Sequence, residues 1–357
     1  MIGRSKEMVL GSILVAAALA AGLLEWSIHP VRNDVIAREE SSPYVDRAVF
    51  CPPAPEGLAS TVDLVASSRE GTDIRLGFEP SREPIFSLVG DQAVGLELER
   101  DEPIDVVGFG ALPAASVATT FESPMKGLGA AACATDASDE WFFPAGSSAI
   151  GFEEKLVLYN PFPDEAVVRV TFFTEGGEIN KAGLADIAVP SKDTTSISIN
   201  KFILQRRALG MRIAALRGRV SAWKSVSVKT EESPTGVTST LGATETATEW
   251  YFPSGAVGEG IDERISILNP TGKEAIVSIS VVSDEETIQP RDLMELKVPR
   301  ASQLDVKLGD AVGPKVMGSV SVVVRSVNST GIVVERSVIY SGDRLTGYAS
   351  EIGATTP

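Results

Sequence analysis

Hydrophobic and polar residues alternate in short runs along most of the chain after its first fifty residues. Apolar side chains occupy every second position at 74–78, 94–98, 168–172 and 277–281. A period of two puts alternate side chains on the same face of an extended chain. Each run therefore predicts a β-strand that buries one face and leaves the other face toward solvent.

One stretch departs from this alternation. Residues 201–209 are preceded by Asn200, a good helix N-cap, and followed by Gly210, a common helix end, and so predict one short helix. Elsewhere Val, Ser and Thr are plentiful and aromatic residues make up only 6% of the chain, which favours strands. We therefore expect an all-β fold.

The chain also repeats itself. The motif at 140–146, Glu-Trp-Phe-Phe-Pro-Ala-Gly, returns as Glu-Trp-Tyr-Phe-Pro-Ser-Gly at 249–255, an offset of 109 residues. The same offset carries the Asn-Pro dipeptide at 160–161 onto the one at 269–270. A repeat of this length is a whole domain, because about a hundred residues can bury a core of their own.

The regular strand and turn signals predict three tandem immunoglobulin-like β-sandwich modules, at 49–138, 139–247 and 248–357. A signal-anchor or transmembrane segment at 1–26 and a polar stalk at 27–48 are expected to precede them.

The beginning of the chain has the pattern of a targeting segment. Arg4 and Lys6 precede an uncharged run at 8–24, which is just long enough to span a bilayer as a helix, and Trp26 follows at interfacial depth. The basic flank predicts a single-pass cell-membrane protein with its N-terminus inside and its C-terminal modules extracytoplasmic. Small residues at 20–22 keep open the alternative of a protein secreted after signal cleavage.

The chain has two cysteines, Cys51 and Cys133, which bracket the first predicted module. Outside the reducing cytosol such a pair most simply forms a disulfide, the alternative being two free buried thiols. The only histidine, His29, lies in the predicted stalk. We therefore expect no metal site, no cofactor and no histidine-based catalytic residues in the modules, and we do not predict an enzyme.

The formal charge is −16, and no dense stripe of Lys and Arg occurs. Nucleic acid is not an expected partner, because phosphate binding needs a concentrated positive surface. The expected partners are the membrane, through residues 8–24, and unidentified envelope proteins or glycans.

Four repeated aromatic residues are the candidate site: Trp141 and Phe143 in the first copy of the motif, Trp250 and Phe252 in the second. They have two interpretations. Their position near the predicted module boundaries favours packing at the junctions. Alternatively, exposed aromatic faces would stack on sugar rings and form a carbohydrate platform.

Several of these features together resemble an actinobacterial family of exported, membrane-anchored proteins of unknown function. The matching residues are Cys51 with Pro52, Cys133, the motif at 141–146 and the Asn-Pro dipeptide at 160–161, and the likeness covers roughly 49–354. The resemblance implies an exported β-sandwich protein and no known activity. The resulting hypothesis is a membrane-tethered structural or protein-interaction scaffold of the cell envelope, with a carbohydrate-binding accessory to an envelope glycan enzyme as the alternative.

Overall fold

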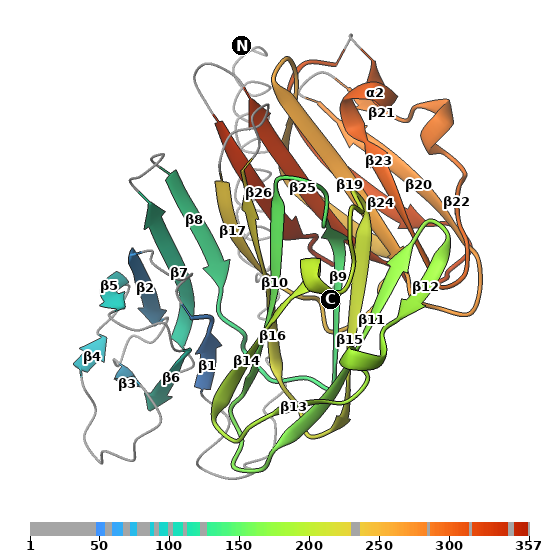
Figure 1. Ribbon diagram of the computed structural model, residues 1–357. Helices are drawn as coiled ribbons and strands as arrows, with labels where there is room; N and C mark the ends of the chain where they lie inside the picture. Colours follow the sequence, from blue (N-terminus) through green and yellow to red (C-terminus); the bar gives the residue numbers. More distant parts are fainter. Residues whose placement is uncertain are drawn as a thin grey trace, which may run out of the picture. The chain divides into compact units, whose positions relative to one another are not determined.

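The computed structural model (Figure 1) describes residues 48–53, 59–66, 72–76, 86–88, 93–98, 103–109, 113–121, 127–229, 236–283, 286–313, 316–341 and 346–355. All of them lie in one compact unit, 47–357. The predicted segment 1–26 and nearly all of the predicted stalk 27–48 lie outside the described residues. Within the described ranges, no helix has the length and apolar character needed to cross a membrane.

The fold is all-β, as the alternating pattern predicts. The described strands form six antiparallel sheets, two from each of three consecutive groups of strands. The first strand group comprises β1 (Ala48–Cys51), β2 (Ala59–Ala66), β3 (Thr72–Leu76), β4 (Phe86–Leu88), β5 (Ala93–Leu98), β6 (Ile104–Phe109), β7 (Pro113–Phe121) and β8 (Gly127–Ala132).

The second and third strand groups follow in the order of the repeat. The second comprises β9 (Glu140–Gly146), β10 (Phe152–Asn160), β11 (Ala166–Thr174), β12 (Gly177–Asn180), β13 (Ile187–Val189), β14 (Asp193–Ser198), β15 (Leu209–Arg217), β16 (Ser221–Val228) and β17 (Gly236–Leu241). The third comprises β18 (Glu249–Val257), β19 (Ile261–Asn269), β20 (Ala275–Val282), β21 (Thr287–Ile288), β22 (Leu296–Val298), β23 (Ser302–Lys307), β24 (Gly318–Ser326), β25 (Val333–Ser341) and β26 (Thr346–Ile352).

The three groups share one strand order. One sheet of each group runs β1-β6-β3-β4, β9-β15-β11-β12 and β18-β24-β20-β21, and the other runs β5-β2-β7-β8, β14-β10-β16-β17 and β23-β19-β25-β26. In the second group, buried residues from both sheets form one core, as the period-two pattern requires. The sequence repeat is visible only in the last two groups, but the strand order shows the same arrangement in the first.

The repeated Asn-Pro dipeptide has a structural reason. The Asn160 amide nitrogen donates to the Asp164 carbonyl at 2.7 Å and to the Val189 carbonyl at 3.1 Å. Asn269 makes the corresponding bonds to Lys273 at 2.7 Å and Val298 at 3.0 Å. Each buried Asn therefore ties the turn after its strand to a neighbouring strand, a role that needs a side-chain donor and acceptor together.

Each strand group closes on its own first strand in the same way. Phe50 pairs with Ala134, Phe142 with Ala243, and Tyr251 with Ala354, each as an isolated antiparallel bridge. The repeated Gly-Ala-Thr sequence at 242–244 and 353–355 is thus the closing segment of a group. In the first group the equivalent segment begins with a cysteine in place of the glycine.

The predicted helix at 201–209 is wrong. The structure has a 3-10 helix, η2, at Ile199–Lys201, followed by turns and then by β15. The equivalent place in the third group holds the α-helix α2, Leu308–Val312. Ile199 and Leu308 are both fully buried. One buried apolar residue therefore fixes the position of each of these short helices.

Candidate functional site

The four predicted aromatic residues are core residues. Trp141, Phe143, Trp250 and Phe252 are at most 2% exposed. The Trp141 indole donates to the Val220 carbonyl at 2.7 Å, and Trp250 donates to the Ile332 carbonyl at 2.9 Å, within the same strand group in each case. Trp141 and Trp250 are buried, as their interpretation as packing residues requires. These buried rings leave no face for a sugar, so the carbohydrate platform at these residues is wrong.

Their interpretation as junction residues also needs correction. Trp141 and Phe143 pack in the core of the second group, whereas Phe142, between them on β9, points the other way and packs in the core of the third. Neighbouring residues of a strand face opposite sides, so one motif serves two cores. The junction aromatic is therefore Phe142.

The preceding junction is built similarly. Phe50, the counterpart of Phe142, packs in the core of the second group and meets the Tyr159 ring edge-on, with centroids 6.0 Å apart. The Tyr159 hydroxyl donates to the Asp105 carboxylate at 2.9 Å. Burial raises the pKa of Asp105 to about 7, although this hydrogen bond partly opposes the shift.

Cys51 and Cys133 form a disulfide, with their Cα atoms 4.2 Å apart, as the sequence predicts. They stand beside the closing bridge between Phe50 and Ala134. In the second group the equivalent positions are Phe143 and Gly242, which touch closely, because a Cβ on Gly242 would lie 2.7 Å from the ring. The disulfide thus occupies the place that an aromatic–glycine contact fills in the second group.

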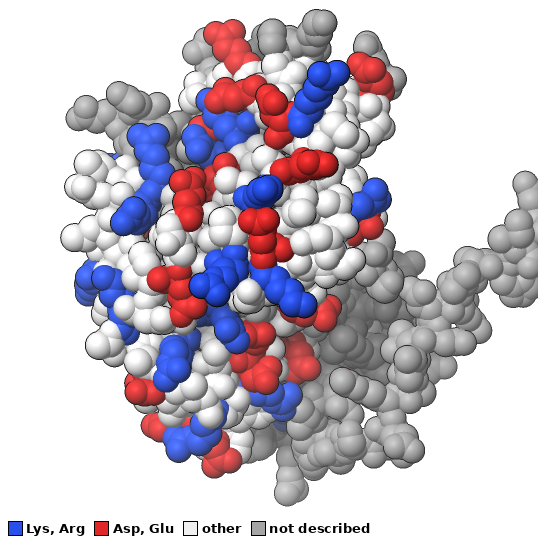
Figure 2. Space-filling model, turned by 90° about the vertical axis from the view of Figure 1, so that its right-hand side faces the viewer, with Lys and Arg blue, Asp and Glu red and all other residues white. Residues whose placement is uncertain are grey.

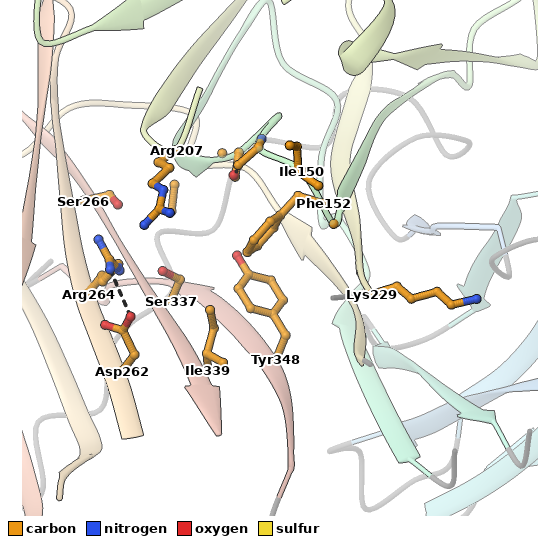
Figure 3. Close-up of a pocket in the computed structure, with 15 residues that line it drawn as sticks. Ile150, Phe152, Arg207, Lys229, Asp262, Arg264, Ser266, Ser337, Ile339 and Tyr348 are labelled. Atoms are coloured by element: carbon orange, nitrogen blue, oxygen red, sulfur yellow. Dashed lines mark hydrogen bonds and ion pairs between the residues drawn. The ribbon is translucent and has the colours of Figure 1, made fainter. Parts of the chain in front are cut away.

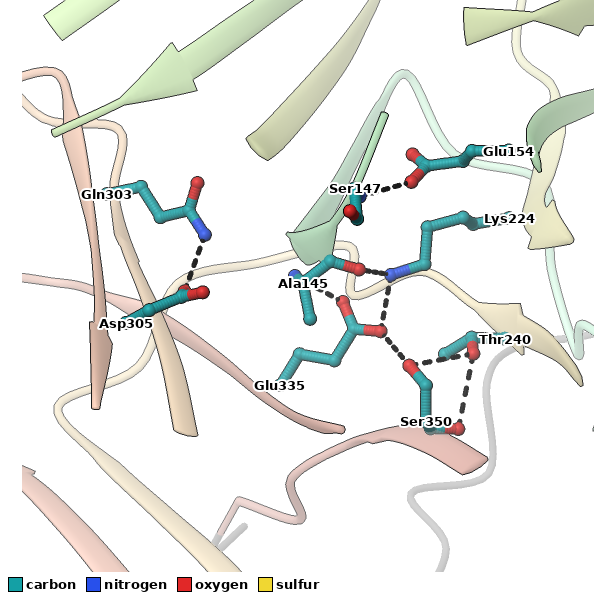
Figure 4. A network of polar contacts seen from close by, with 9 residues as sticks. All are labelled: Ala145, Ser147, Glu154, Lys224, Thr240, Gln303, Asp305, Glu335 and Ser350. Carbon is teal, nitrogen blue, oxygen red and sulfur yellow. Dashed lines mark hydrogen bonds and ion pairs between the residues drawn. The ribbon is translucent and has the colours of Figure 1, made fainter. Parts of the chain in front are cut away.

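A buried ionic network joins the second and third groups (Figure 4). The Lys224 ammonium, on β16, lies 2.5 Å from the Glu335 carboxylate, on β25, and also donates to the Ala145 carbonyl. Glu335 in turn accepts from the Ala145 backbone N–H at 2.8 Å and from the Ser350 hydroxyl. Lys224 and Glu335 are fully buried, so each charge depends on these partners.

A second carboxylate, Glu154 on β10, lies close to the same network. It is fully buried and accepts the Ser147 backbone N–H at 2.7 Å, while its other oxygen has no hydrogen-bond partner among the described residues. Burial raises the pKa of Glu154 to about 7, and Glu335 adds to the rise, whereas Lys224 and the Ser147 hydrogen bond lower it. Neither Glu154 nor Glu335 lines the adjacent cavity.

The third group contains a related arrangement. Glu263, on β19, accepts the Ala256 backbone N–H at 2.8 Å, just as Glu154 accepts that of Ser147. Arg336 pairs opposite Ile265 on β25, as Lys224 pairs opposite Leu156, and it reaches Glu351 at 2.7 Å. A buried acidic residue next to a basic residue is thus a feature of both copies of the repeat. In each copy the acidic side chain accepts a backbone N–H at or near the end of the first strand.

A cavity of about 590 Å³ opens beside this network, between the loop after β9 and the strands β19, β25 and β26 (Figure 3). Its charged lining residues are Arg207, Lys229, Asp262 and Arg264. Ser147, Ser266 and Ser337 add hydroxyl groups, and Ile150, Phe152, Ile339 and Tyr348 add apolar surface. The cavity therefore offers cations, hydroxyl groups and aromatic rings to a small ligand.

Charge on one face of the molecule is mixed. Figure 2 shows acidic and basic side chains interspersed over one face, without a block of a single sign. Surface ion pairs such as Arg217 with Glu165 at 2.7 Å fit this mixing. Among the described residues, no group of three His, Cys, Asp or Glu side chains is arranged to hold a metal ion.

Sequence reasoning missed the network and the cavity. Lys224 stands in an alternating strand pattern, and that pattern does not reveal that its inward face meets another strand group. One signal was present, because Glu154 and Glu263 are identical at the offset of 109 although both interrupt apolar strands. Arg207 and Arg264 carry no comparable signal, since isolated arginines are common on surfaces.

Comparison with known proteins gives a family and no activity. No curated protein matches the sequence. The crystal structure of Thermotoga maritima 1070 is 21% identical, with a TM-score of 0.27, over 30% of this chain and 94% of its own. The Anabaena sensory rhodopsin transducer is 26% identical, with a TM-score of 0.22, over 26% of this chain and 95% of its own. Neither similarity bears on function at these TM-scores.

A model described as a family of unknown function (DUF5719) matches residues 108–338, which is more than half of the chain. The match includes the repeated aromatic motif and most residues of the cavity and of the buried network, and it ends before Ile339, Tyr348 and Ser350. It agrees with the expected relationship to an uncharacterised family. The chain belongs to DUF5719, a family of unknown function.

Proposed function

We propose that this protein is a membrane-tethered extracytoplasmic scaffold of the cell envelope, which presents surfaces to protein partners and catalyses no reaction. The observation that carries the proposal is the buried pair of Lys224 and Glu335 between the second and third strand groups. A pair with no solvent contact requires the two groups to keep one arrangement, because separation would leave each charge without its partner. A fixed arrangement of domains suits a scaffold.

The proposed architecture is three immunoglobulin-like modules at 49–138, 139–247 and 248–357. The common strand order of the three groups supports it, as does the closing bridge in each. Tethering rests on the uncharged run at 8–24 and its basic flank. The alternative is secretion after signal cleavage.

The test of the scaffold is crosslinking in intact cells, with the full chain carrying a C-terminal tag. We expect the protein in the membrane fraction, resistant to carbonate extraction, with the tag accessible from outside and defined envelope proteins crosslinked. A control chain lacking residues 8–24 should lose the membrane association. Recovery in the cytosol, or no specific crosslinked protein, would contradict the proposal.

One observation favours the second candidate, a carbohydrate-binding accessory to an envelope glycan enzyme. The buried aromatic motif does not support it, but the cavity beside the network does, because it combines charged, hydroxyl and aromatic side chains. The sugar would therefore bind at this cavity and not at Trp141 or Trp250.

A further inference from the structure

We propose that the cavity between the second and third strand groups binds an acidic saccharide, a sugar chain that carries carboxylate or phosphate groups. The assignment deepens the carbohydrate-binding candidate and rests on it. It does not depend on the scaffold role or on the membrane.

The charge of the site selects an anion. Arg207 is exposed and forms no ion pair with any described residue, although the chain as a whole carries a formal charge of −16. Arg264 donates to Asp262 at 2.9 Å through one guanidinium nitrogen, which leaves its other donors for a ligand. Figure 3 shows Arg207 and Arg264 on the same side of the cavity, with Lys229 well apart. Arg207, together with the guanidinium nitrogens of Arg264 that do not bind Asp262, offers N–H donors to an oxyanion.

The rest of the lining selects a sugar. Ser337 supplies a hydroxyl group that can donate and accept hydrogen bonds, as sugar hydroxyl groups do. The Ser147 and Ser266 hydroxyl groups also line the cavity, but they are already bonded to the Arg206 carbonyl and to the Asp305 carboxylate. Phe152 and Tyr348 meet edge-to-face, with ring centroids 6.0 Å apart and planes at 87°. The edge of one ring packs against the face of the other, and together the two rings form an apolar surface in the cavity. The C–H groups of a sugar ring can pack on this surface while its hydroxyl groups meet the polar side chains.

The size of the cavity and its place between two strand groups also fit a small ligand. A cavity of about 590 Å³ lies within the usual range for small-ligand sites. Its walls come from two strand groups that the Lys224–Glu335 pair holds together, so the site is formed before the ligand arrives. A preformed site avoids the cost of ordering side chains on binding.

The test is calorimetric titration of the detergent-solubilised full chain with trigalacturonate, which carries carboxylates. Glucose 1-phosphate is the phosphate probe, and chitotriose is the neutral control. We expect one of the two acidic probes to bind at least about tenfold more tightly than chitotriose, and the effect to fall with added salt. The preferred acidic probe then identifies a uronate-type or a phosphate-type source.

Arg207→Gln should weaken binding of that probe by at least about tenfold, because it removes a charge-assisted contact. Arg291→Gln is the matched control, since Arg291 is exposed and does not line the cavity, and it should leave binding unchanged. Near-ultraviolet circular dichroism verifies that both variants remain folded. The proposal is overturned if neither acidic probe binds, or if Arg207→Gln binds the preferred probe as tightly as the wild type does. It is also overturned if a triglutamate peptide binds as tightly as that probe or more tightly.

Discussion

Glu154 is a carboxylate in a place where ionisation is costly. Burial raises its pKa to about 7 from the ordinary value of 4.5. Between these values the folded protein holds a proton that the unfolded chain has released, so the free energy of unfolding falls as pH rises. The contribution of Glu154 is fully present below about pH 4.5 and is lost by about pH 7.

Glu154→Gln should therefore remove part of the pH dependence of stability. From pH 7 to pH 4.5, the wild type should gain on the order of 3 kcal/mol relative to the variant. Asp105, whose pKa is raised in the same direction, contributes equally to both proteins and cancels. Urea titrations at the two pH values measure the difference. A variant with the same pH dependence as the wild type would show that Glu154 is ionised at pH 7.

Gly242 is required by its neighbour, not by its backbone conformation. A Cβ at this position would lie 2.7 Å from the Phe143 ring. Gly242→Ala should therefore lower the free energy of unfolding by about 1–3 kcal/mol, because a buried ring must move. Gly272→Ala is the control, since a Cβ there meets nothing within 4 Å. Urea unfolding checks both, and equal stability of the two variants would contradict this account.

At the scale of elements, the contact between β16 and β25 rests on Lys224 and Glu335. Removing one partner of a buried pair leaves an uncompensated charge. Lys224→Met or Glu335→Leu alone should lower the free energy of unfolding by about 3–5 kcal/mol. The double variant Lys224→Met with Glu335→Leu removes both charges and should recover most of that loss. A double-mutant cycle in guanidinium chloride measures this, and a double variant as unstable as the sum of both single changes would contradict it.

The first strand of each group is the element that connects neighbouring groups. β9 buries Trp141 and Phe143 in its own core and Phe142 in the next one. β18 occupies the same place in the third group, but Tyr251 there is only half buried. The Glu249 side chain beside it forms an ion pair with Arg325. A polar residue at this end position suits a strand face that no further described group covers.

At the scale of the whole molecule, the first strand group differs from the others by its disulfide. Cys51 and Cys133 are 82 residues apart in the sequence and close the first group at the position of the Phe143–Gly242 contact. Replacing both with alanine should lower the free energy of unfolding of this group by about 4 kcal/mol, because the unfolded chain regains the freedom of a long loop.

The third group should keep its stability in that variant, since its core contains no residue of the first group. The second group should lose part of its stability, because Phe50 and Ala134, the neighbours of the two cysteines, pack in its core. Hydrogen exchange with mass spectrometry resolves the groups separately, with the oxidised wild type as control. Uniform loss of protection across 47–357 would instead indicate that the three groups unfold together.

Local patterns in the sequence were enough to predict the strands, the long repeat, the disulfide and the burial of the tryptophans. These predictions depend on alternation along a strand, on turn residues and on a single pair of cysteines. Such signals are local or involve few residues, so they can be recognised without knowing the tertiary structure.

Only the tertiary structure decided which groups meet across the strands. The alternating pattern predicts which face of a strand a side chain lies on, but it does not predict what packs against that face. The sequence therefore could not show that Phe142, and not Trp141, is the residue at the junction. The same holds for the Lys224–Glu335 pair, whose members are 111 residues apart. The cavity lining comes from loops and outer strand faces of two groups, and such a site forms only when the groups are packed together.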